Sequence, residues 1–144
     1  MKTLIALVGE KGGGKETLGN LIIEMAQKEV KTVSRFRFSD ILNATLEMWG
    51  IDRTRPNLQK LAKVMDASYG EGTLTRAVKR RFENDSADIA IADGVRWESD
   101  RVMIRGIAGS VMVYVTADAG LRYNRCVARA RVDENKKTFE EFMN

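Results

Sequence analysis

Four short apolar segments recur along the chain, and each ends in glycine or in polar residues. They span residues 3–9, 32–40, 87–95 and 110–117. Short apolar runs bounded in this way are typical of strands in a sheet that is covered on both faces. In the second segment Phe36 and Phe38 alternate with polar residues, so we expect Arg35 and Arg37 to point outward. The pattern predicts four β-strands.

The segments between these runs repeat their apolar residues every three or four positions, as amphipathic helices do. After the first run, Leu18, Leu21, Ile22 and Met25 follow this spacing. The predicted helices cover residues 15–29, 41–50, 56–70, 72–85, 99–109, 120–132 and 138–144.

Several side chains are expected to finish the helices or to fill the interior. Ser39 and Asp40 are good caps for the second helix, and Ser99 is a candidate cap for the fifth. For Trp49 and Trp97 we favour packing over a ligand role. Five methionines occupy positions typical of a core, namely Met25, Met48, Met65, Met103 and Met112.

The order of these elements predicts the fold class. Strands alternate with helices, and the connections are long enough to cross over, which favours a mainly parallel sheet with helices on both faces. There is no internal repeat, low-complexity segment or linker. We therefore predict a single α/β domain over residues 1–144, with three layers in the order α/β/α.

The stretch GEKGGGKET, residues 9–17, follows the first predicted strand and opens the first predicted helix. Phosphate-binding loops have a glycine, four further residues and then Gly-Lys-Ser/Thr, and Gly9, Gly14 and Lys15 match this spacing. A helix start favours a polyphosphate, and Gly12 and Gly13 let the backbone approach an anion without an intervening Cβ. We predict triphosphate binding; a glycine-rich turn that binds nothing is the alternative.

Glu16 stands where such loops carry Ser or Thr, whose hydroxyl normally holds Mg²⁺ beside the phosphates. A carboxylate is also a hard oxygen ligand for Mg²⁺, directly or through water. Thr17 keeps a hydroxyl one position further on, within reach of an inner phosphate. Glu16 and Thr17 are therefore candidate metal ligands.

The stretch IAIADGVR places a carboxylate at the end of the third predicted strand. Open α/β sheets bind ligands at the carboxyl ends of their strands. Beside a phosphate loop, Asp93 would orient metal-bound water or accept a hydroxyl proton, and Arg96 would face a phosphate. Asp-Gly turn chemistry is the alternative for this stretch.

Two further polar clusters are candidates for the same site. Helix 120–132 carries Arg122, Arg125, Arg129 and Arg131 before a polar turn. We assign Arg122 to a solvated face and expect the other three to belong to a lid that neutralises phosphate charge. Asp40 ends the second strand; helix capping and substrate contact both remain open for it.

Composition limits the chemistry and the partners. The chain has no histidine and one cysteine, so reactions must run on Asp, Glu, Lys, Arg and backbone amides. A formal charge of +4, with 14 arginines against 10 lysines, favours phosphate recognition. The basic residues are dispersed, which does not favour nucleic acid. No membrane-length apolar run or signal peptide is present, so we expect a cytoplasmic protein.

Taken in order, GEKGGGKET, FSD, NLQKLAKVMDASYG, DGVR and an arginine-rich helix before KTFEEF resemble the P-loop nucleoside monophosphate kinase-like group. The resemblance covers nearly the whole chain and includes deoxynucleoside monophosphate kinase-like, dephospho-CoA kinase-like and archaeal adenylate kinase-related proteins. It implies a P-loop NTPase fold, with acceptor-binding helices at about residues 40–84 and a lid at about residues 125–137. Such kinases usually have a fifth strand after the lid, which we do not expect here because the chain stops at Asn144.

The resemblance also implies an activity and a set of contacts. It implies an ATP-dependent kinase that transfers the γ-phosphoryl group to a nucleotide-like small molecule, with Mg²⁺. Asp40, Asp93 and Arg96 would surround the acceptor, and Arg125, Arg129 and Arg131 would be lid arginines. A non-catalytic nucleotide-binding module is the alternative, and a homodimer is left open. The implied contacts to ATP phosphates and Mg²⁺ are Gly9, Lys11, Gly12, Gly14, Lys15, Glu16 and Thr17.

Overall fold

The computed structural model describes residues 2–95, 97–129 and 138–143, and within them four strands form one sheet. The strands lie in the order β2-β3-β1-β4, and every neighbouring pair is parallel. Their bounds are β1 Thr3–Val8, β2 Val33–Arg37, β3 Ile89–Asp93 and β4 Val111–Tyr114. The predicted α/β class, with four parallel strands, is confirmed.

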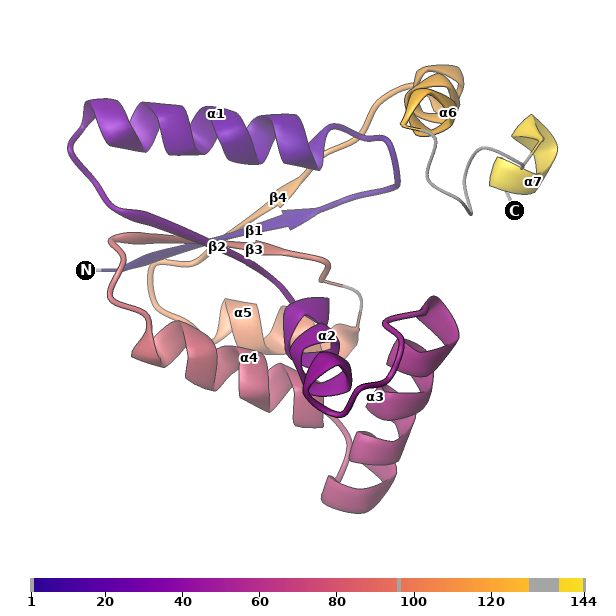
Figure 1. The fold of residues 1–144 in the computed structure, drawn as a ribbon. Coiled ribbons are helices and arrows are strands. Elements are labelled where there is room, and N and C mark those ends of the chain that lie inside the picture. Colours follow the sequence, from indigo (N-terminus) through magenta and orange to yellow (C-terminus); the bar gives the residue numbers. More distant parts are fainter. Residues whose placement is uncertain (1, 96, 130–137, 144) are drawn as a thin grey trace.

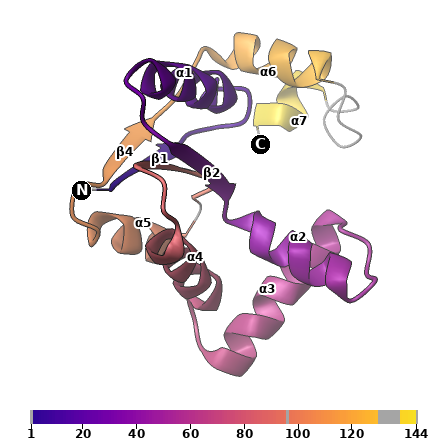
Figure 2. The same ribbon diagram turned by 60° about the vertical axis from the view of Figure 1, so that its left-hand side comes forward.

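Helices cover both faces of this sheet (Figure 1). Helix α1 (Lys15–Lys28) lies on one face, and α4 (Thr73–Asn84) and α5 (Glu98–Arg105) lie on the other. Helices α2 (Ser39–Met48) and α3 (Arg55–Tyr69) project from one side of the carboxyl edge of the sheet, as Figure 2 shows. Helices α6 (Ala119–Ala128) and α7 (Phe139–Met143) lie on the opposite side of that edge.

The strand order determines where a ligand can bind. After β1 the chain crosses to β2 and β3 on one side of β1, and it then returns to β4 on the other side. In open parallel sheets a crevice forms outside the carboxyl ends of the strands where the order reverses in this way. The loop after Val8 of β1 lies at this reversal, between the segments that follow β3 and β4.

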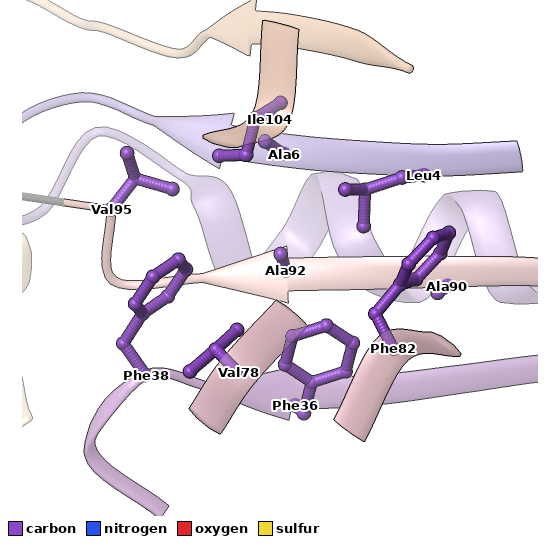
Figure 3. Close-up of a cluster of buried hydrophobic side chains, with 10 residues drawn as sticks. All are labelled: Leu4, Ala6, Phe36, Phe38, Val78, Phe82, Ala90, Ala92, Val95 and Ile104. Atoms are coloured by element: carbon purple, nitrogen blue, oxygen red, sulfur yellow. The ribbon is translucent and has the colours of Figure 1, made fainter. Parts of the chain in front are cut away.

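The main hydrophobic core lies between the sheet and helices α4 and α5 (Figure 3). Leu4, Ala6, Ala90 and Ala92 from the central strands are at most 1 % exposed. The small alanine side chains leave room for the large ring of Phe82, which reaches the sheet from α4. A second cluster, formed by Leu42, Leu46 and Leu61, holds α2 against α3. Helices α2 and α3 therefore have apolar packing of their own.

Some expected interior residues are on the surface. Met25 is 67 % and Met48 79 % exposed, and Trp49 and Trp97 are 58 % and 64 % exposed. These four packing predictions are wrong. On α1 the helical spacing marks a wide apolar stripe, but the residues it buries are Gly19 and Ala26, so Met25 lies beside the buried stripe.

Two helix starts also differ from prediction. Trp97 is the N-terminal cap residue of α5, and Asp100, not Ser99, closes the first turn by accepting a hydrogen bond from the Trp97 backbone N–H. Helix α2 begins after Phe38 without a side-chain cap. Asp40 instead accepts a hydrogen bond from the backbone N–H of Arg37, at 2.7 Å. This bond ties the end of β2 to the first turn of α2.

Candidate functional site

The loop between β1 and α1 has a conformation that glycine permits. Gly9, Gly12 and Gly14 have φ angles of +135°, +73° and +103°. A Cβ at Gly9 would lie 1.9 Å from the carbonyl oxygen of Val115, and one at Gly12 would lie 2.4 Å from that of Arg122. The outer side of the loop is therefore packed against the segment after β4 and against α6, and only glycine fits there.

The inner side of the loop is open at the start of α1. For a Cβ built at Gly14, the nearest atom is Nη1 of Arg125, at 3.8 Å. No side chain caps the N-terminus of α1, whose first residue is Lys15. The first N–H groups of a helix have no partner within the helix, and the helix dipole adds positive potential. A helix start of this kind forms a cradle that can bind an anion such as phosphate.

Lys15 bends back over the loop. Its Nζ donates hydrogen bonds to the carbonyl oxygens of Gly9, at 2.6 Å, and Glu10, at 2.8 Å. The ammonium group is thus held at the mouth of the cradle, where it adds a full positive charge to the partial charges of the backbone N–H groups. The arrangement is complementary to a polyphosphate anion.

The arginines of α6 divide between two environments. Arg125 donates a hydrogen bond from Nη1 to the carbonyl oxygen of Gly12, at 3.1 Å, and so reaches the loop. Arg129 donates to Sγ of Cys126 on its own helix, at 3.1 Å. Arg122, assigned from sequence to a solvated face, is half-buried and donates from Nε to the carbonyl oxygen of Ala117. Arg131 lies outside the described residues.

Asp93 ends β3 and is 6 % exposed. It is aligned with Leu7 of β1, two residues before the glycine loop begins. Its Oδ2 accepts two hydrogen bonds from Arg35, from Nη2 at 2.6 Å and from Nε at 3.1 Å. The prediction that Arg35 points outward is therefore wrong, because α1 covers the face of the sheet on which this side chain lies. Arg96 lies outside the described residues.

The remaining predicted residues lie at the edges of the site. Lys11, Glu16 and Thr17 are exposed, while Gly13 is buried within the loop. A Cβ at Gly13 would lie 2.7 Å from the carbonyl oxygen of Val115. Within residues 2–95, 97–129 and 138–143, no group of three or more acidic or cysteine side chains could hold a metal ion. The role of Glu16, Thr17 and Asp93 toward Mg²⁺ stays a prediction.

Glu10, inside the loop, was not predicted as a site residue. Its own backbone N–H and the hydroxyl of Tyr114 donate hydrogen bonds that hold the pKa of the Glu10 carboxyl below its usual value. The same contact raises the pKa of the Tyr114 hydroxyl. Glu10 therefore stays ionised and ties the loop to β4, at the edge of the sheet.

A buried carboxylate supports the segment that follows Asp93. Asp100 is 1 % exposed; its Oδ1 accepts a hydrogen bond from Oγ1 of Thr75, at 2.6 Å, and its Oδ2 accepts one from the Trp97 N–H, at 3.0 Å. These bonds fix the start of α5 to α4. The sequence offered only a weak signal for them, a Trp-Glu-Ser-Asp stretch before an apolar helix.

The glycine cradle, Lys15 and the 2-3-1-4 strand order can be compared with known proteins. No protein-family model matches the chain. It is similar in structure to a shikimate kinase from Bacteroides thetaiotaomicron, with a TM-score of 0.53, 16 % identity and coverage of 98 % of this chain and 73 % of that one. The chain has a P-loop kinase-like fold.

Two further proteins are similar over nearly the whole chain. TT1252 from Thermus thermophilus has a TM-score of 0.54 and 13 % identity, over 99 % of this chain and 77 % of its own. A UPF0200 protein from Hyperthermus butylicus is 25 % identical over 141 residues, which are 98 % of this chain and 72 % of that protein. At 16 % and 13 % identity, the likeness to the two solved structures shows the fold alone.

Proposed function

We propose that the protein is an ATP-dependent phosphotransferase whose acceptor is a nucleotide or a nucleotide-like small molecule. The observation that carries the proposal is the convergence of Lys15 and Arg125 on a glycine loop that opens a helix at the sheet reversal. A backbone cradle for phosphate, an ammonium group beside it and a guanidinium from a separate helix support the proposal, because they are recurring parts of sites that transfer phosphoryl groups.

The proposed roles follow from position. The backbone N–H groups of Gly12, Gly14 and Lys15 bind the β- and γ-phosphates, while the Gly13 N–H donates within the loop to the carbonyl oxygen of Glu10. Lys15 leaves the two loop carbonyls to neutralise phosphate charge. Arg125 lies beside the loop and stabilises charge that develops during transfer. Mg²⁺, when bound with the nucleotide, supplies further charge neutralisation near Glu16, Thr17 and Asp93.

The acceptor is proposed to bind between the loop and the α2–α3–α4 side of the carboxyl edge, with Asp40 and Arg96 among its contacts (Figure 2). In the transfer, the bond between the γ-phosphorus and its bridging oxygen breaks, and a bond to an acceptor oxygen forms. ADP leaves with the electron pair. If the acceptor is a hydroxyl, its proton passes to Asp93 or to water; a phosphate acceptor needs no such step.

A non-catalytic nucleotide-binding module is the second candidate, and one observation favours it. The Asp93 carboxylate is already engaged by Arg35 through two hydrogen bonds to one oxygen. A carboxylate that holds a guanidinium within the fold has a structural role, which a module without transfer activity would also use. The module would keep the cradle and Lys15 but would transfer nothing.

An ADP-release assay distinguishes the two candidates. The protein is supplied with ATP, Mg²⁺ and one acceptor at a time, from a panel of nucleoside monophosphates, dephospho-CoA and shikimate, and Lys15→Ala is run beside it. Phosphotransfer predicts acceptor-dependent ADP release that Lys15→Ala abolishes. ATP binding through Lys15 without acceptor-dependent release would favour the module, and the absence of ATP binding would contradict both.

A further inference from the structure

We propose that Arg35 is a positioning residue that fixes the Asp93 carboxylate relative to the phosphate loop. This inference rests on the proposed function of the loop. Arg35 lies on β2 and Asp93 on β3, and the two side chains meet on the face of the sheet that α1 covers. Both hydrogen bonds from Arg35 end on Oδ2 of Asp93, so Oδ1 is not used by the guanidinium.

The guanidinium is itself held from a third element. Its Nη1 donates a hydrogen bond to Oδ1 of Asn20 on α1, at 3.0 Å. Helix α1 is the helix that begins at Lys15, directly after the loop. One planar side chain thus links the helix that starts at the loop, strand β2 and the carboxylate at the end of β3. A guanidinium can do this because its N–H donors point in fixed directions.

Gly19 is the independent observation that this placement matters. It is buried in the middle of α1, where glycine destabilises a helix relative to alanine. Its φ angle is not positive, so backbone conformation does not require glycine there. A Cβ at Gly19 would lie 2.8 Å from Cζ of Arg35 and 2.9 Å from Nη1 and Nη2. Space for the guanidinium is therefore what glycine provides.

A purely structural role is the alternative, because a buried carboxylate needs a partner whatever it does. The two roles differ in what a displaced guanidinium would change. A positioning role requires the Asp93 carboxylate in one orientation, in which Oδ1, the oxygen that Arg35 does not bond, faces the bound Mg²⁺ and ATP. A structural role requires only that the charge be paired, and its loss lowers stability without a specific effect on metal-dependent binding.

Gly19→Ala separates these roles. The added methyl group contacts the flexible end of Arg35, so the helix accepts it at little cost while the guanidinium must move. Arg35→Lys keeps the charge but cannot bond Asn20 and Asp93 in the same plane, and Arg35→Gln removes the charge. Gln27→Ala, an exposed substitution on the same helix, is the matched control.

The experiment measures ATP affinity by calorimetry with Mg²⁺ and with EDTA, together with the melting temperature, for each variant. We expect the Mg²⁺-dependent gain in ATP affinity to fall about 10-fold or more in Gly19→Ala and Arg35→Gln, as for partners that orient metal ligands. For Arg35→Lys, the Mg²⁺-dependent gain in ATP affinity should lie between the gains of these two variants and that of the wild type. Affinity in EDTA and the melting temperature of Gly19→Ala should match Gln27→Ala.

Two results would overturn the inference, and they differ from failure of the proposed function. If the wild type binds Mg·ATP and Gly19→Ala and Arg35→Gln keep the full Mg²⁺-dependent gain, Arg35 does not position Asp93. The same conclusion follows if the ATP affinity of these variants falls by the same factor with Mg²⁺ and with EDTA, and if their melting temperatures fall as well. If the wild type itself does not bind ATP, the proposed function fails, and the inference fails with it.

Discussion

The guanidinium of Arg125 on α6 donates a hydrogen bond to the carbonyl oxygen of Gly12, at 3.1 Å across 113 residues of sequence. It brings a cation from beyond β4 to the loop that follows β1. The contact is exposed, so it contributes little to stability, and in the proposed function Arg125 exchanges this carbonyl for a phosphate oxygen.

Arg125→Ala should therefore reduce transfer far more than folding. We expect kcat to fall at least about 100-fold, since arginines that stabilise the transferring phosphoryl group are worth 10³–10⁵ in kcat. The melting temperature should stay within a few degrees of the wild type. Arg105→Ala, at the exposed end of α5, is the control, and equal kcat values for the two variants would contradict the role of Arg125.

Alanine substitutions at two loop glycines should separate the effect of packing from that of backbone conformation. Gly14→Ala places a methyl group in ordinary van der Waals contact with Nη1 of Arg125, at 3.8 Å, so its cost is the left-handed conformation, about 1–2 kcal/mol. Gly9→Ala meets a backbone oxygen at 1.9 Å and should cost more than about 3 kcal/mol. Urea unfolding measures the free energy of unfolding of both variants. An equal decrease in the two variants would show that the loop does not pack against the segment after β4.

Asp100→Ala should destabilise the protein without touching the loop. Alanine removes both of the buried oxygens that accept hydrogen bonds from the Thr75 hydroxyl and from the Trp97 N–H, at a cost of about 1–3 kcal/mol. The control is Glu98→Gln, which removes an ion pair to Arg101. The Glu98 side chain is 67 % exposed, so this substitution should change the free energy of unfolding by less than about 0.5 kcal/mol. Denaturant midpoints for the two variants that coincide would refute the burial argument.

Asp88 makes a prediction for acid stability. The backbone N–H and hydroxyl of Thr32 donate hydrogen bonds to its Oδ2, which hold the pKa of this carboxyl below its ordinary value of 3.8. A lowered folded pKa stabilises the fold above the unfolded value, and this stabilisation is lost as the pH falls through the folded one.

Asp88→Asn should accordingly lower the melting temperature at pH 7, and the difference from the wild type should shrink below pH 3.8. Thermal unfolding from pH 7 down to strongly acidic buffers measures this difference. A melting-temperature gap that stays constant over the whole range would show that ionisation of Asp88 is not involved.

The position of the glycine loop between β1 and α1 could be predicted from sequence because its determinants are local. Gly9, Gly14 and Lys15 have a fixed spacing between an apolar strand and an amphipathic helix, and the structure places them there. The fold class could also be predicted from local patterns, because a chain of alternating strands and helices can adopt only a few topologies.

The environment of Asp93 could not be predicted, because it depends on which strands are neighbours. Alternation along β2 correctly separated Arg35 from Phe36, but it does not reveal that α1 covers the second face or that β2 lies beside β3. The exposed Met25 has a similar cause: helical spacing marks a stripe, while the width that is buried depends on the partner surface. Long-range pairings of this kind need the three-dimensional structure.

The most direct test of the account is calorimetric ATP binding, with Mg²⁺, by the wild type, Lys15→Ala and Lys28→Ala. The two lysines start and end the same helix, so both variants lose one charge from α1. The account predicts that the wild type and Lys28→Ala bind ATP alike and that Lys15→Ala binds at least about 10-fold more weakly, a loss of about 1.4 kcal/mol. Equal binding by all three proteins, or none by the wild type, would contradict it.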